Sequence, residues 1–352
     1  MGKIEVLGKW DLANGEWIKN PEQRFLGRSF ALAHYDKIIN NNGKINYIIF
    51  AHGSRIEDHT SNYCEIKESK VGMKNIIDHY RNCNGNYAIK LFLMDADAPI
   101  IEDAKLLAEY IEILASIPTT NSINLIGLSK CGVMSFYVPR FFKQAVTFSK
   151  TNIYNIATPY QGNKLASPLI FYPEVQKLIS SKIDNELVSS FIYNKLIKLY
   201  EGISSNSHMD YDIGKLGGIP NDRMHLYDES LIKNIFVDEN VSTIKKINCF
   251  KNFITGIDEK TLRESFFNRD YIGVGLCMLD ELFFDNKSDG MVYTEEQKTV
   301  EKVLDIKSYT LESSHHNVSS SQRVISDILK VVDDTVEEND KEKIKIKVNG
   351  GF

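Results

Sequence analysis

A serine at the end of an apolar segment is the residue best placed for nucleophilic chemistry. Ser129 follows the apolar residues 123–127 and precedes residues 132–145, whose pattern is that of a helix. A sharp strand-to-helix turn of this kind lifts a serine hydroxyl clear of the sheet. The segment is therefore predicted to be a nucleophile elbow with Ser129 as the nucleophile.

The residues around this serine meet the steric demands of such a turn. Side chains two positions before and two after the serine must be small, and Gly127 and Cys131 occupy these positions. Cys131 departs from the usual glycine, but it is small and Gly132 follows it. The backbone N–H of Lys130 is expected to point towards the site where an oxyanion forms.

A second oxyanion donor is expected after an earlier apolar segment. Residues 46–51 form a short β-rich segment that ends at His52 and Gly53, with Ser54 next. A glycine there lets the backbone approach a substrate, and the predicted donor is the N–H of Ser54. The alternative interpretation is an ordinary turn that ends the strand.

A serine hydroxyl needs a base, and the base needs an acid that orients it. Triads built on such elbows run in the order serine, acid, histidine along the chain. His315 and His316 follow a late apolar segment and precede an amphipathic helical pattern. His315 is the predicted base, because Val318 and Val324 are spaced to anchor the helix that follows it, and His316 is the alternative.

Two aspartates compete for the role of the acid. Asp289 lies in a turn-forming Asp-Gly pair ahead of Val292, which favours it as the acid. An ordinary Asp-Gly turn would give the same pattern. Asp258, which directly follows the apolar segment 247–256, is the alternative acid.

The order of the apolar and amphipathic segments predicts the fold class. Strands are predicted at 46–51, 89–94, 123–127, 152–157, 247–256 and 303–309, and helices at 101–117 and 132–145. Strands that alternate with helices indicate βαβ units and a mostly parallel sheet with helices on both faces. Ligand sites in such sheets lie beyond the carboxyl ends of the strands, where the residues above are found.

In this order the motifs resemble the landmarks of the bacterial-type triacylglycerol lipase and esterase branch of the α/β-hydrolase family. They are His52 to Ser54, Gly127 to Gly132, Thr158 to Gly162, Asp289 to Val292, and His315 to Val318. The resemblance covers roughly residues 45–330. It implies an α/β-hydrolase fold, a Ser-Asp-His triad, an oxyanion hole of two N–H groups, and a helical cap after the Thr-Pro motif.

The chain is expected to have a discontinuous core, an insertion and a tail. Residues 1–162 and 246–332 are predicted to form the α/β-hydrolase core. Residues 163–245 are rich in Ser, Asn and Lys and match the helical cap, or lid, that the resemblance implies. Residues 333–352 mix Asp, Glu and Lys and are predicted to be a solvated, charged C-terminal tail.

Composition excludes several classes of function. Hydrophobic residues make up 43% and charged residues 25% of the 352 residues, which is typical of globular proteins. A formal net charge of -5 argues against a nucleic-acid partner. No apolar run reaches the roughly 18–20 residues of a membrane span, and the start lacks a signal peptide, so a cytoplasmic location is expected, with unconventional export left open.

The five cysteines are widely spread without a C-x-x-C pair, which predicts neither a disulfide framework nor a metal site. No cofactor is expected. A stripe at helical spacing within the cap either lines an acyl pocket or forms the cap's own core; it consists of Tyr193, Leu196, Leu199 and Tyr200.

The expected function is hydrolysis of a small-molecule or lipid carboxylic ester through an acyl-enzyme intermediate. Transient contact of the cap with a membrane surface is compatible with this function. The alternatives are an acyl-thioesterase or a peptidase on the same fold, and a non-catalytic hydrolase-like protein that binds an acyl ligand or a protein partner.

Overall fold

The computed structural model describes most of the core of the chain. The described residues are 4–11, 16–19, 30–37, 43–52, 64–81, 83–93, 100–160, 186–187, 190, 193–194, 236, 238–257, 288–290, 292–315 and 317–349. Of the predicted cap, residues 163–245, these ranges include only a few isolated positions and the helix α9 (Asp238–Ile244).

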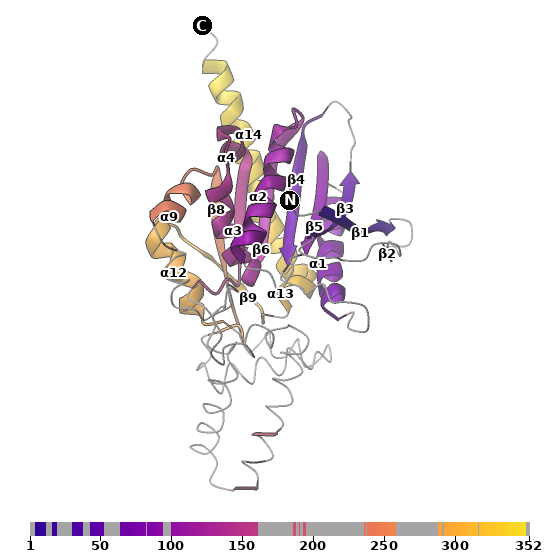
Figure 1. Ribbon diagram of the computed structural model, residues 1–352, viewed down its shortest axis with the longest axis vertical. Helices are drawn as coiled ribbons and strands as arrows, with labels where there is room; N and C mark the ends of the chain where they lie inside the picture. Colours follow the sequence, from indigo (N-terminus) through magenta and orange to yellow (C-terminus); the bar gives the residue numbers. More distant parts are fainter. Residues whose placement is uncertain are drawn as a thin grey trace.

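A nine-stranded, mostly parallel sheet crosses the described residues in the order β2-β1-β3-β5-β4-β6-β7-β8-β9 (Figure 1). The strands are β1 (Ile4–Asp11), β2 (Glu16–Lys19), β3 (Phe30–Lys37), β4 (Ile45–His52), β5 (Asn86–Leu93), β6 (Thr120–Leu128), β7 (Thr151–Ile156), β8 (Cys249–Gly256) and β9 (Tyr309–Glu312). All strands from β4 to β9 are parallel, whereas β3 runs antiparallel to β5. The predicted α/β class is confirmed.

Helices cover both faces of the sheet. α1 (Cys64–Arg81), α13 (Asn317–Ser320) and α14 (Gln322–Asn349) lie on one face, and α2 (Ile100–Ser116), α3 (Lys130–Tyr137), α9 and α12 (Thr294–Leu304) lie on the other (Figure 1). The central strand β4 supplies both cores, because successive side chains of a strand point to opposite faces. Ile48 and Phe50 pack on the α1 and α14 side, and Ile49 and Ala51 on the α2 and α3 side.

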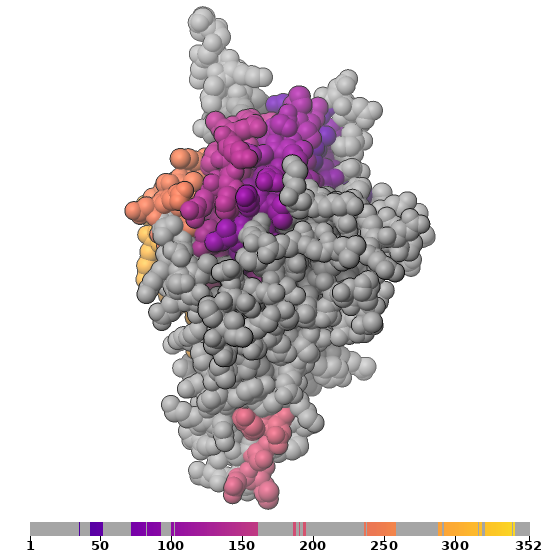
Figure 2. All heavy atoms as spheres, viewed as in Figure 1, coloured from indigo at the N-terminus to yellow at the C-terminus, as the bar shows by residue number. Residues whose placement is uncertain are grey.

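The predicted helix 132–145 is interrupted. It consists of α3, the 3₁₀ helix η1 (Val138–Phe141) and α4 (Ala145–Lys150). Pro139 lies in η1 and cannot donate the backbone hydrogen bond that a continuing α-helix requires. In the space-filling view, residues 100–160 adjoin residues 238–257 (Figure 2), and an Arg140–Glu239 ion pair of 2.9 Å joins η1 to α9.

The predicted strand at 303–309 is wrong in its position. Val303 and Leu304 belong to α12, where they continue the helical spacing set by Val300, and β9 begins only at Tyr309. Asp305 ends the helix with a left-handed φ of 53°. The apolar residues assigned to one strand are therefore divided between a helix and a strand.

A ladder of polar side chains crosses the middle of the sheet. Ser122 Oγ donates to Asn46 Oδ1 at 2.8 Å, and Asn124 Nδ2 donates to Ser122 Oγ at 3.0 Å. Asn152 Nδ2 then donates to Asn124 Oδ1 at 2.8 Å, and Asn248 Nδ2 donates to Asn152 Oδ1 at 2.6 Å. The ladder joins β4, β6 and β7 to the residue just before β8, and Asn124 and Asn152 are completely buried.

The last helix continues through the segment predicted to be a charged tail. α14 extends to Asn349, and its first half packs on the sheet through buried apolar residues as far as Val336. Across the described helices, none combines the length and the apolar character that crossing a membrane requires.

Candidate active site

Ser129 lies on a strained turn between β6 and α3. Its backbone angles, φ 56° and ψ −123°, are ones that a residue with a side chain rarely adopts. Two hydrogen bonds hold the turn: Ser129 N donates to Ile156 O at 2.9 Å, and Gly132 N donates to Ser129 O at 2.8 Å. The turn therefore has the conformation expected of a nucleophile elbow.

Glycines are required on both sides of this serine. A Cβ added to Gly127 would lie 2.7 Å from the carbonyl oxygen of Cys131, and one added to Gly132 would lie 1.9 Å from Thr158 Oγ1. No such crowding is imposed by the side chain of Cys131, which is completely buried in the core on the α2 and α3 side. A cysteine in place of glycine at position 131 therefore fits the turn, because the positions at which a Cβ would clash are Gly127 and Gly132.

The thiol of Cys131 is not a rival nucleophile. Burial raises the pKa of Cys131 well above its usual value, so the thiol stays protonated at neutral pH. Ser129 and Lys130, by contrast, are both partly exposed.

His315 joins the serine to a carboxylate. Its Nε2 lies 2.9 Å from Ser129 Oγ, and its Nδ1 lies 2.8 Å from Asp289 Oδ2. A neutral imidazole that carries its proton on Nδ1 can donate to Asp289 and accept from Ser129 at the same time. Ser129 comes directly after β6, Asp289 comes after β8 and His315 comes after β9 along the chain. The three residues thus form one hydrogen-bonded row at the carboxyl ends of these strands.

Asp289 is held from several directions although it is completely buried. Its Oδ1 accepts from Val292 N at 2.8 Å, and its Oδ2 accepts from Thr255 Oγ1 at 2.6 Å and from Gln297 Nε2 at 3.4 Å. Its backbone oxygen accepts from His315 N at 2.8 Å. The carboxylate is therefore fixed on both oxygens, and its backbone also fixes the residue it faces.

Thr255 and Gln297 are the contacts that sequence analysis missed. Thr255 is the second-last residue of β8, and Gln297 lies in the first turns of α12. The side chain of Gln297 also pairs with the backbone of Thr255, accepting from its N–H at 2.8 Å and donating to its carbonyl at 3.1 Å. Neither residue belongs to a motif, because a threonine in a strand and a glutamine in a helix are ordinary.

Only some of the other predicted site residues lie among the described residues. Ser54, Asp258 and His316 lie outside the described residues. Lys130 is the first residue of α3, directly after the serine. His52 ends β4 beside Leu128, the residue before Ser129, so the chain leaves β4 next to the elbow.

A sheet of this topology, with a serine on the turn between a central strand and its helix, and with an acid and a histidine after later strands, has the α/β-hydrolase fold. This is the class of fold that the motifs predicted.

Comparison with solved structures finds remote likenesses. Lipase BlEst2 of Bacillus licheniformis in its mature form is 14% identical with a TM-score of 0.46, and the match covers 85% of this chain and 97% of that one. A lipase-esterase related protein from Clostridium acetobutylicum is 14% identical with a TM-score of 0.42, over 85% of this chain and 98% of that one. A structure from work on carboxylesterases of Nitrososphaera gargenis is 13% identical with a TM-score of 0.44, over 89% and 97%.

No protein-family model and no curated protein matches the sequence. Likenesses as remote as those to the solved structures assign no residue a role.

Proposed function

We propose that this protein is a serine hydrolase that cleaves carboxylic esters, with Ser129 as nucleophile, His315 as general base and Asp289 as the acid that orients it. The observation that supports this most is the row from Ser129 Oγ to His315 Nε2, at 2.9 Å, and from His315 Nδ1 to Asp289 Oδ2, at 2.8 Å. Each distance lies within the range over which a proton can be shared or transferred.

In the first half of the proposed reaction, His315 Nε2 takes the proton of Ser129 while Oγ bonds to the ester carbonyl carbon. The carbonyl electron pair moves onto its oxygen. When that pair returns, the bond to the alcohol oxygen breaks, and the leaving alkoxide takes the proton from His315. Asp289 stays ionised throughout and stabilises the imidazolium.

Water completes the cycle. His315 takes a proton from water, the resulting hydroxide attacks the acyl-serine, and collapse returns the proton to Ser129 Oγ as the carboxylic acid leaves. The N–H groups of Lys130 and Ser54 are the proposed oxyanion donors. Support for Lys130 comes from its place at the start of α3, where backbone N–H groups point away from the helix.

The substrate proposed for this site is a small-molecule or lipid ester, with the cap at 163–245 covering the acyl group. Triad geometry does not identify the leaving group, so thioesters and peptides are compared directly with esters. A panel of p-nitrophenyl esters of rising chain length, acyl-thioesters and peptide anilides ranks the three reactions by kcat/KM.

Labelling with a fluorophosphonate probe tests the proposal. The full chain and Ser149→Ala, a control at an exposed serine of α4, are expected to take up one label, and Ser129→Ala none. Equal labelling of the Ser129→Ala variant, or unchanged ester turnover by it, would overturn the proposal. A native chain that is inert to the probe would favour the non-catalytic binding protein.

A further inference from the structure

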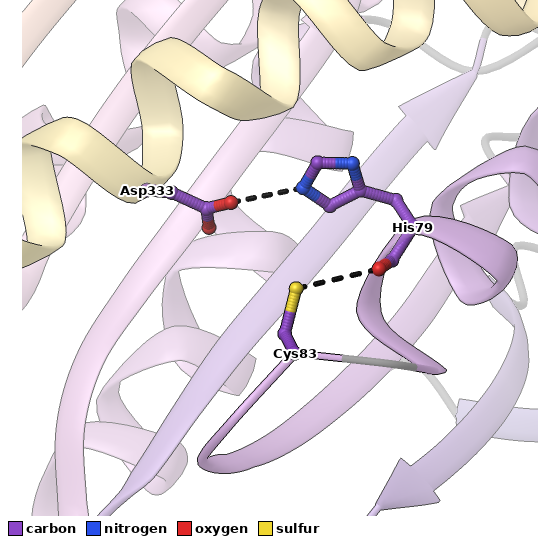
Figure 3. Close-up of side chains that lie close together, drawn as sticks. All are labelled: His79, Cys83 and Asp333. Carbon is purple, nitrogen blue, oxygen red and sulfur yellow. Dashed lines mark hydrogen bonds and ion pairs between the residues drawn. The ribbon is translucent and has the colours of Figure 1, made fainter.

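A second cluster of potential ligands joins two helices on the opposite face of the protein from α2 and α3. His79 lies in the last turn of α1, Cys83 follows that helix, and Asp333 comes from the middle of α14 (Figure 3). His79 Nε2 lies 2.9 Å from Asp333 Oδ2, and Cys83 Sγ donates to the carbonyl oxygen of His79 at 3.3 Å. The three side chains direct their nitrogen, sulfur and oxygen atoms towards one region.

From this cluster we propose a binding site for Zn²⁺ formed by His79, Cys83 and Asp333, with a water molecule as the fourth ligand. Imidazole, thiolate and carboxylate are the side chains that Zn²⁺ takes as ligands, and thiolate disfavours Ca²⁺ and Mg²⁺. Three protein ligands with an open fourth position are a known arrangement for this ion.

The geometry is close to what the ion requires. Zinc bonds of about 2.0–2.3 Å in a tetrahedron place neighbouring ligand atoms roughly 3.3–3.6 Å apart. One ligand atom from each of the three residues lies within 4.8 Å of the other two. Movements of about 1.5 Å or less, within reach of side-chain rotation, would bring the three atoms to these separations.

The backbone also brings the three ligands together. His79 lies in the last turn of α1, and a hydrogen bond of 3.2 Å from Cys83 N to Tyr80 O turns the chain so that Cys83 stays beside the end of this helix. Asp333 approaches from α14, which packs against α1 in the described core. Because the ligands come from two helices, a bound ion would connect them.

The charges balance when the ion is bound. The thiol releases its proton to solvent, the Sγ–H bond is replaced by an Sγ–Zn bond, and no electron is transferred. One thiolate, one carboxylate and a neutral imidazole then offset the two positive charges of the ion.

Binding of Co²⁺ to the full chain tests the site, because Co²⁺ bound to thiolate shows a sulfur-to-metal charge-transfer absorption that other ligands do not give. We expect one Co²⁺ per chain with this absorption, and its displacement by one equivalent of Zn²⁺. Three substitutions keep the local hydrogen bonding while weakening a ligand: Cys83→Ser, His79→Gln and Asp333→Asn.

Each variant is expected to bind Zn²⁺ at least about 100-fold more weakly in calorimetry. Cys249→Ser is the control, because Cys249 is another partly exposed cysteine that does not belong to the cluster. Near-ultraviolet circular dichroism of each metal-free variant checks that it is folded. Absence of the charge-transfer absorption in the native chain, its survival in Cys83→Ser, or its loss in Cys249→Ser would overturn the proposal.

Discussion

Two histidine–aspartate pairs in this protein have nearly the same length but different surroundings. His315 and Asp289 are 2.8 Å apart, and their side chains are 17% and 0% exposed. His79 and Asp333 are 2.9 Å apart, but their side chains are 21% and 29% exposed. Asp289 also accepts hydrogen bonds from Thr255, Gln297 and Val292, which hold it in one orientation.

The comparison shows that a short contact between a histidine and a carboxylate does not define a site. The third group near each pair decides what the pair can do. Beside His315 it is a serine hydroxyl, 2.9 Å from the ring nitrogen that does not face the carboxylate, which favours proton transfer. Near His79 and Asp333 it is the thiol of Cys83, which favours binding of a metal ion.

The largest difference between the pairs is expected when each histidine is changed in the same way. His315→Gln should lower kcat for ester hydrolysis by about 10⁶-fold, because no group then accepts the Ser129 proton. His79→Gln, in metal-free buffer, should change kcat by less than about twofold. Steady-state kinetics with a p-nitrophenyl ester measures both, and equal losses would break the distinction.

The two aspartates should differ next. Asp289→Asn keeps the shape of the side chain but favours the wrong tautomer of His315, and we expect kcat to fall about 10⁴-fold. Asp333→Asn serves as the matched change in the other pair. If Asp289→Asn kept full activity, Asp258 would become the stronger candidate for the acid.

A smaller effect is expected from the hydroxyl that holds Asp289. Thr255→Val removes the donor at 2.6 Å from the buried carboxylate, and a hydrogen bond to a charged group contributes about 1.5–3 kcal/mol. If part of that energy orients His315, kcat should fall roughly 10- to 100-fold while KM changes little. Thr255→Ser restores the donor and should recover most of the activity, whereas a purely structural role would leave kcat per folded molecule unchanged.

The smallest effect should come from breaking the more exposed pair. A partly exposed contact of this kind is worth about 1 kcal/mol or less, so Asp333→Asn should lower the free energy of unfolding by no more than this in the absence of metal. Urea denaturation followed by tryptophan fluorescence measures the change. A loss of several kcal/mol would show that this pair is as strongly coupled to the fold as the buried one.

The residues of the proposed site that follow strands could be predicted from the sequence, and in the structure they lie within hydrogen-bond distance of one another. Ser129, Asp289 and His315 could be named because parallel strands end at one edge and the order of the motifs along the chain narrowed the choice. Thr255 and Gln297 could not be named, since their contact with Asp289 depends on how α12 packs against β8 and leaves no local pattern.

The same distinction applies to the fold. The buried strands β4 to β8 were predicted because their apolar runs are short and bounded, whereas β1 to β3 were not identified. Ile4 and Val6 alternate with polar residues in β1, which is a strand signal, although an isolated one. At the other end, Val303 fits a helix and a strand equally well, and only the position of Asp305 separates the two.

The polar ladder through Asn124 and Asn152 fixes the strand register on which the proposed mechanism depends. A strand advances about 3.3 Å per residue, so slipping β6 by one place would carry the Ser129 hydroxyl about that far from the imidazole it must reach. Such a slip would also leave buried amide side chains without hydrogen-bond partners, at a cost of roughly 1–3 kcal/mol each. Buried side chains in the middle of the sheet thereby fix the distance between the proposed nucleophile, Ser129 Oγ, and the imidazole of His315.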